Sequence, residues 1–197
     1  GKTFAQSGYR EWGGIMQTDV EDALTHLVSE GMVDPDRACI MGYSYGAYAA
    51  MQAAVATPDA YRCVLAGGGV YDLREMQKWS QAERGSNSST YEYWLTQLGD
   101  PVNDYDDLIA RSPARHVERL KAPVFLFHGR EDNIVPIEQA ELLRSRLDSA
   151  NKTFEYVVMD KSGHSYGAYR TDEPETIRRD ILEFLSRYNP TNRNPGY

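Results

Sequence analysis

The chain has 197 residues, which suffices for one domain with a substantial core but is short for two. With 41% hydrophobic and 25% charged residues, it has the composition of an ordinary globular protein. Its formal net charge of −8 argues against nucleic acid or an anionic membrane as a partner. No apolar run approaches the ~20 residues that a membrane-spanning helix needs.

Helical and strand-like segments alternate along the first third of the chain. After Gly13-Gly14, apolar residues at helical spacing predict a helix that ends near Gly31. Its apolar face comprises Met16, Val20, Ala23 or Leu24, and Leu27 or Val28. Apolar runs over residues 38–43 and 63–66 predict two strands. The alanine-rich stretch between them predicts a helix whose small side chains let it lie close on a sheet.

The second half continues this alternation. Residues 123–127 and 154–158 predict two further buried strands, and residues 137–147 and 173–188 predict two helices. In the last helix we expect four residues to face inward: Ile177, Ile181, Leu182 and Leu185. Strands with almost no polar alternation, separated by helices, are typical of an α/β fold with a mostly parallel sheet covered on both faces.

Composition predicts the character of the parts of the chain outside these strands and helices. Residues 72–113 are aromatic and loop-rich, and we interpret them as an insertion that forms a lid. The tail over residues 190–197 is predicted to be disordered, which leaves one domain over residues 1–189. A basic group is interpreted as a solvated helix face: Arg111, Arg115, Arg119 and Lys121.

The chain has two cysteines, Cys39 and Cys63, and each falls in a predicted strand. Cysteine behaves as a small hydrophobic residue in cores, so both are predicted to be buried free thiols. They form no cluster with the spacing of a metal site. Two cysteines do not determine the compartment, so cytoplasmic and periplasmic or secreted locations both stay open.

The most informative motif is Gly42-Tyr43-Ser44-Tyr45-Gly46, which links the first predicted strand to the alanine-rich helix that follows it. A G-x-S-x-G sequence between a strand and a helix is typical of a sharp turn that exposes a serine hydroxyl. Glycine is expected at positions 42 and 46 because the backbone at the serine is strained and side chains at these flanking positions would crowd the turn.

Serine is a poor nucleophile unless a base removes its proton, so the four histidines of the chain are the candidate bases for Ser44. His26 lies within a helix and His116 in the basic stretch, and both are interpreted as structural or exposed. His128 ends the third strand just before a glycine and is interpreted as a packed strand-end residue. His164 follows the fourth strand in a glycine-containing loop. A loop at the carboxyl end of a strand can reach the elbow serine, so His164 is the predicted base.

Two loops offer a carboxylate to orient that histidine. Asp132 follows the third strand and precedes the rigid Ile134-Val135-Pro136 segment, so its loop is short and constrained. We therefore favour Asp132, with Glu131 and Asp72 as alternatives. The resulting order, Ser44 then Asp132 then His164, is the one expected of a nucleophile elbow.

The chain resembles the catalytic domain of the prolyl oligopeptidase family, in particular its dipeptidyl-peptidase and acylaminoacyl-peptidase-like members. The resemblance runs from about residue 8 to residue 188. It rests on Trp12-Gly13-Gly14, the elbow, Ser112-Pro113, His128-Gly129-Arg130-Glu131-Asp132 with Val135-Pro136, and Gly163-His164. Ala47 departs from the pattern, because the family usually has a second glycine there.

The resemblance implies a mechanism. Ser44 would attack a carbonyl to form an acyl-enzyme, His164 would act as general base and then acid, and Asp132 would orient it. The backbone N–H of Tyr45 would be one oxyanion donor, whose loss costs roughly 10²–10³ in rate. The second donor is expected upstream of Gly1, as is the β-propeller that limits this family to short peptides.

The predicted fold is a partial α/β-hydrolase, whose four strands correspond to the last four of that fold. The strand at 38–43 would then lack a neighbour and present an unpaired edge. We expect that edge to be covered by rearranged local segments or by a second copy of the chain in a homo-oligomer.

The leading hypothesis is a serine peptidase that cleaves short peptides with no cofactor or metal. The same three side chains would also serve an esterase. A third hypothesis is a catalytically silent assembly module.

Overall fold

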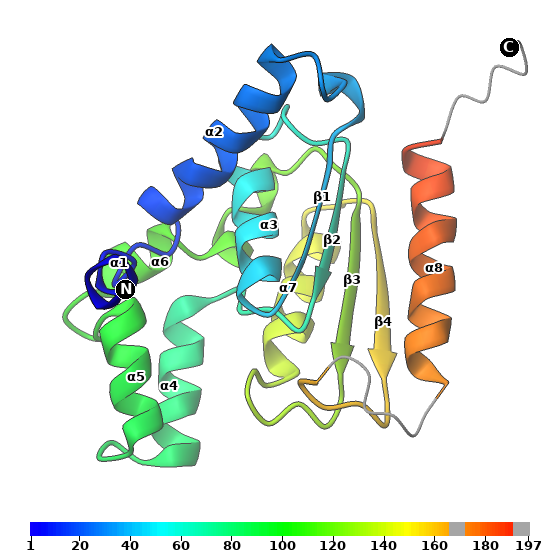
Figure 1. Cartoon of the computed structure of the whole chain (residues 1–197). Helices are drawn as coiled ribbons and strands as arrows, with labels where there is room; N and C mark the ends of the chain where they lie inside the picture. Colours follow the sequence, from blue (N-terminus) through cyan, green and yellow to red (C-terminus); the bar gives the residue numbers. More distant parts are fainter. Residues whose placement is uncertain (166–171, 191–197) are drawn as a thin grey trace, which may run out of the picture.

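The structure is a computed structural model that describes residues 1–165 and 172–190. A four-stranded sheet in the order β1-β2-β3-β4 forms its centre (Figure 1). Neighbouring strands run parallel, so their carboxyl ends meet at one edge of the sheet. The strands are β1 (Cys39–Tyr43), β2 (Cys63–Gly67), β3 (Val124–Gly129) and β4 (Phe154–Met159).

Helices connect and cover these strands. They are α1 (Lys2–Gln6), α2 (Ile15–Ser29), α3 (Tyr45–Ala56), α4 (Leu73–Arg84), α5 (Ser89–Leu98), α6 (Tyr105–Ala110), α7 (Glu138–Ser149) and α8 (Glu173–Tyr188). The described residues also form the short 3₁₀ helices η1 (Pro35–Arg37), η2 (Pro113–Arg115) and η3 (Val117–Arg119). Within the described residues, no helix combines the length and apolar character needed to span a bilayer.

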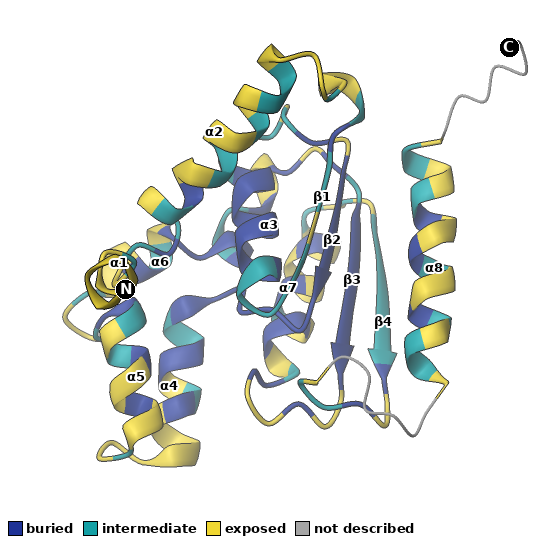
Figure 2. Ribbon diagram, viewed as in Figure 1, coloured by how far each residue is buried: buried dark blue, intermediate teal, exposed yellow. Residues whose placement is uncertain are grey.

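Helices lie on both faces of the sheet, as an α/β fold requires. Figure 1 shows α3 and α7 on one face and α8 on the other. Successive strand residues divide between these layers: Val64 and Leu126 pack with α3 and α7, whereas Leu65 and Phe125 pack with α8. Strands β2 and β3 are buried along their whole length (Figure 2). The predicted covered parallel sheet is therefore confirmed.

The inward face of α8 differs from the prediction at one position. Ile177 and Ile181 are buried and Leu185 packs against them, but Leu182 is 65% exposed. Phe184 is fully buried instead. The stripe runs through 177, 181 and 184, and residue 182 lies about 100° further round the helix, on the solvent side.

Strand β1 is an edge strand. Among the described residues it pairs with β2 alone, and Met41 is 57% exposed. Within residues 1–165 and 172–190, the expectation that local segments rearrange to pair with this edge is therefore wrong. Its covering by a second copy of the chain stays a prediction.

The cysteines are not free thiols: Cys39 and Cys63 form a disulfide. They are register partners on the adjacent parallel strands β1 and β2, with their Cα atoms 4.7 Å apart. Their side chains point to the same face of the sheet, within reach of a disulfide. The sequence placed both residues in strands, but it did not show that these strands start side by side.

Residues 72–113 are mainly helical rather than loop-rich. Helices α4, α5 and α6 contribute to a second cluster of buried side chains that includes Trp12 and Tyr48. Their polar residues form exposed helix faces (Figure 2), which is why the segment resembles loops in sequence. The boundaries of the domain and of the insertion stay predictions, and residues 191–197 of the expected disordered tail lie outside the described part.

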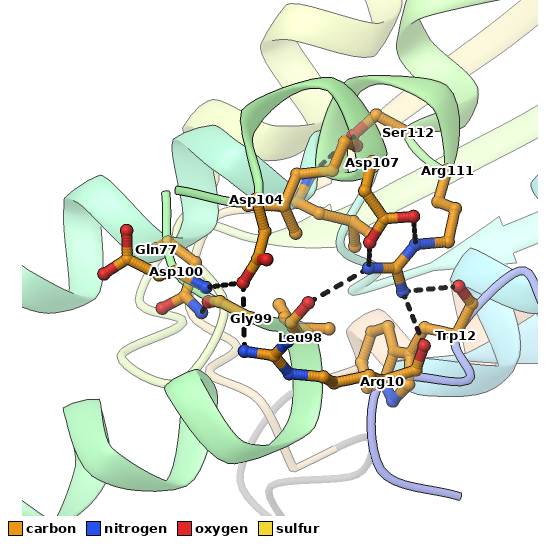
Figure 3. Close-up of polar contacts among 12 residues, drawn as sticks. Arg10, Trp12, Gln77, Leu98, Gly99, Asp100, Asp104, Asp107, Arg111 and Ser112 are labelled. Carbon is orange, nitrogen blue, oxygen red and sulfur yellow. Dashed lines mark hydrogen bonds and ion pairs between the residues drawn. The ribbon is translucent and has the colours of Figure 1, made fainter. Parts of the chain in front are cut away.

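Arg111 is the main exception to the solvated basic face, because it is only 8% exposed. Its guanidinium donates to the backbone carbonyls of Arg10, Trp12 and Leu98 and pairs with the Asp107 carboxylate (Figure 3). This one side chain thereby links α6 to the end of α5 and to the segment before α2. The prediction of a solvated arginine is wrong at this position.

Candidate active site

The predicted serine lies at the sharp turn between β1 and α3. Ser44 has φ 56° and ψ −121°, a left-handed backbone that a residue other than glycine rarely adopts. Gly42 is required by a close approach, because a Cβ there would lie 2.0 Å from the carbonyl oxygen of Gly46. At Gly46 itself an added Cβ would meet nothing within 4 Å. The crowding expected at both glycines therefore applies to Gly42 only.

Asp132 lies in the loop after β3, at the carboxyl edge of the sheet. Its Oδ1 accepts hydrogen bonds from the backbone N–H groups of Ile134 and Val135, each 2.9 Å long. His128 approaches Oδ2 through Nε2 at 3.4 Å. The side chain of Asp132 is fully buried, so these donors replace water around the carboxylate.

These contacts keep the carboxyl group ionised. Burial alone would raise the pKa of Asp132. Hydrogen bonds from His128, from His164 and from two backbone N–H groups outweigh burial and hold that pKa well below its usual range. A buried anion therefore lies where a protonated imidazole could be balanced.

His164 bridges Asp132 and Ser44. Its Nδ1 lies 2.7 Å from Asp132 Oδ2, and its Nε2 lies 2.9 Å from Ser44 Oγ. When Nδ1 donates to the carboxylate, Nε2 has no proton and can accept one from the serine hydroxyl. Three side chains from three separate loops thus form one hydrogen-bonded path at the carboxyl edge of the sheet.

The loop that carries His164 is held at several points. Glu131 N–H donates to the Ser162 carbonyl at 3.0 Å, and Ser162 Oγ donates to Glu173 at the start of α8 at 2.6 Å. The hydroxyl of Tyr43 donates to the backbone carbonyl of His164 at 2.8 Å. The last contact was not predicted from the sequence, since it joins residues 121 positions apart.

The structure does not bring the alternative residues into this path. Asp72 is buried, but it accepts from the N–H of Glu75 in α4 and pairs with Arg115 at 2.5 Å. Glu131 and His26 are exposed. His116 contacts the carbonyl of Ile109.

His128 is buried as predicted, and its Nε2 lies 2.9 Å from the Val135 carbonyl oxygen. The same nitrogen lies 3.4 Å from Asp132 Oδ2, a contact that was not predicted from the sequence. The four-residue spacing between His128 and Asp132 was the available signal.

The sequence profile of the prolyl oligopeptidase family matches residues 1–190. The chain belongs to this family. Among curated proteins it is similar to the dipeptidyl aminopeptidase BIII of Pseudoxanthomonas mexicana, at 29% identity over 173 residues, 84% of this chain and 24% of that protein. It is also similar to the acylamino-acid-releasing enzyme of Rattus norvegicus, at 26% identity over 162 residues, 78% of this chain and 21% of that protein.

Solved structures of two peptidases share the fold. The acylaminoacyl peptidase of Pyrococcus horikoshii superposes with a TM-score of 0.83 at 21% identity, over 98% of this chain and 31% of that chain. A puromycin-hydrolyzing peptidase of Mycobacterium tuberculosis gives 0.80 at 24% identity, over 93% of this chain and 27% of that chain. The α/β-hydrolase fold is thereby confirmed. The chain spans less than a third of the length of each of these proteins.

Proposed function

We propose that this chain carries the catalytic triad of a serine peptidase that cleaves short peptides through an acyl-enzyme. The observation that supports this most strongly is the path from Asp132 through His164 to Ser44, with links of 2.7 and 2.9 Å. Both links lie in the range over which a base and a nucleophile exchange a proton. The strained backbone at Ser44 presents its hydroxyl at the turn, as a nucleophile elbow does.

In the proposed mechanism, Ser44 Oγ attacks the carbonyl carbon of the scissile bond while His164 Nε2 takes the hydroxyl proton. The C–N bond then breaks, and His164 returns that proton to the leaving amine. A water molecule, deprotonated by the same nitrogen, next attacks the ester and releases Ser44. Asp132 stays ionised throughout and balances the imidazolium that forms in each half-reaction.

The proposed oxyanion donor is the backbone N–H of Tyr45. Tyr45 is the first residue of α3, and the first N–H groups of a helix have no acceptor within the helix. The positive end of the helix dipole lies at the same place, which favours a developing negative charge. The second donor is proposed to come from a segment upstream of Gly1, as the family resemblance implies.

Short peptides are proposed as substrates because of the names that the similar proteins carry. Two of the similar proteins are named a dipeptidyl aminopeptidase and an acylamino-acid-releasing enzyme. Within the same mechanism, an esterase would use the same three side chains. A silent assembly module would keep the fold without reacting.

A substrate panel distinguishes these functions. The protein is incubated with dipeptidyl-4-nitroanilides, acetyl-aminoacyl-4-nitroanilides and 4-nitrophenyl acetate, beside a Ser44→Ala variant. The proposal predicts nitroaniline release that falls by a factor on the order of 10⁴–10⁶ in the variant. Hydrolysis of the ester alone would identify an esterase. Absence of any Ser44-dependent turnover would support the silent module.

A further inference from the structure

The residue before the proposed nucleophile contacts the proposed base. Tyr43 ends β1, and its hydroxyl donates to the backbone carbonyl of His164 at 2.8 Å. The two rings also lie near each other, with centroids 5.5 Å apart and planes inclined by 47°. Tyr43 therefore holds the backbone of His164 while its neighbour Ser44 bonds the His164 ring.

The position of this hydroxyl is itself well defined. The Tyr43 ring packs beside Phe127 of β3, at 6.2 Å between centroids. It also lies on the bare backbone of Gly68, where an added Cβ would come within 2.9 Å of the ring. Gly68 has φ +56°, so this position favours glycine for its backbone as well. A ring confined from these sides presents its hydroxyl in one place.

The hydrogen bond between Tyr43 and His164 completes a closed ring of contacts with Ser44. The backbone joins Tyr43 to Ser44, the Ser44 hydroxyl bonds His164 Nε2, and the His164 carbonyl bonds Tyr43. Displacement of the His164 backbone would change the distance from Nε2 to Oγ directly. A misplacement of about 1 Å at a reacting group can cost on the order of 10²-fold in rate.

We infer that Tyr43 is a positioning residue that fixes the imidazole of His164 over Ser44 through its hydroxyl. The inference rests on the proposed function, since it assigns Tyr43 a role in the same reaction. Tyr43 acts through His164 and not on the substrate. Loss of its hydroxyl should therefore lower kcat and leave KM unchanged.

The test is the Tyr43→Phe variant, which removes one oxygen and keeps the ring. One hydrogen bond contributes about 0.5–1.5 kcal/mol, so kcat on the best substrate of the panel should fall about 2- to 10-fold. KM should stay constant. In a His164→Ala background the same substitution should cause no further loss of the residual rate, because no imidazole remains to be positioned.

Tyr48→Phe is the matched control. The Tyr48 hydroxyl also donates to a backbone carbonyl, that of Arg111 at 2.9 Å, but from a fully buried side chain in α3. It should lose as much thermal stability as Tyr43→Phe, or more, with kcat unchanged. A general loss of stability would lower kcat in both variants alike and would overturn the inference.

Failure of this inference can be told from failure of the proposed function. If Tyr43→Phe keeps the full kcat while Ser44→Ala and His164→Ala each reduce turnover to a small residual rate, the positioning role is wrong and the triad stands. If Tyr43→Phe lowers the rate equally with and without His164, its effect does not pass through the imidazole, and the inference is again wrong. If Ser44→Ala retains turnover, the proposed function itself fails.

Discussion

Reduction of the disulfide between Cys39 and Cys63 should destabilise this chain substantially. The two residues are 24 positions apart, so the bond closes a loop of that length in the unfolded state. The chain-entropy relation for such a loop gives about 3.4 kcal/mol at 25 °C. For a domain of this size, each kcal/mol shifts Tm by about 2–4 °C, so Tm should fall by about 7–14 °C.

The assay compares thermal unfolding of the oxidised protein with that of protein reduced in denaturant and refolded with a phosphine reductant. Reduction must take place in denaturant because Cys63 is fully buried. Thiols are counted in denaturant before and after treatment, with none expected before and two after. The Cys39→Ala/Cys63→Ala double variant is the control, and reductant should leave its Tm unchanged.

Two results would refute this reasoning. Two reactive thiols in the unreduced, denatured protein would mean that the bond does not form. A Tm that stays constant although both thiols have become free would mean that the link between β1 and β2 adds no stability.

Further predictions concern the acid, the elbow glycines and the buried arginine. Asp132→Asn should lower kcat by a factor on the order of 10⁴, as the same substitution does in a serine protease triad. Because the folded-state pKa of Asp132 is lowered, its stabilisation is complete above the unfolded pKa near ~4 and is lost as pH falls through the folded value. Urea unfolding from pH 6 to pH 2 should therefore show a smaller acid loss in the Asn variant, and equal losses would contradict the assignment. Gly42→Ala should lower the free energy of unfolding by about 1–3 kcal/mol or more, since its Cβ would meet a carbonyl oxygen at 2.0 Å. Gly46→Ala should leave that free energy unchanged or raise it, because the added Cβ meets nothing within 4 Å. Equal unfolding free energies for these two variants would show that the turn is not built as described. Arg111→Met should lower the free energy of unfolding by about 2–4 kcal/mol in chemical denaturation, because it leaves buried carbonyls without a donor. Arg119 is exposed, so Arg119→Met should lower it by less than about 0.5 kcal/mol. Similar losses in the two variants would show that Arg111 does not link these segments.

The residues at the candidate site could be predicted because each lies in a short, local pattern. Ser44 lies in a pentapeptide between a strand and a helix, and Asp132 and His164 lie in the loops that follow β3 and β4. The carboxyl ends of parallel strands meet at one edge, so a correct assignment of strands brings these loops together. No knowledge of strand order was needed for that step.

The features that were missed depend on the order of strands or on contacts over long distances in sequence. The disulfide needs β1 and β2 to be neighbours in a matching register, which apolar runs do not reveal. Arg111 is buried because carbonyls from two distant segments converge on it, and its local sequence is that of a solvated helix. The contact between Tyr43 and His164 likewise joins two segments that share no local pattern.

The central claim is that Ser44 is a nucleophile activated by His164, and covalent labelling tests it most directly. The protein is treated with a fluorophosphonate, and the modified residue is located by peptide mass spectrometry in the unaltered chain and in Ser44→Ala and His164→Ala variants. The account predicts one adduct, on the peptide that contains Ser44, absent from the first variant and strongly slowed in the second. An unmodified Ser44 after prolonged treatment of the folded protein, or equal labelling of all three proteins, would contradict it.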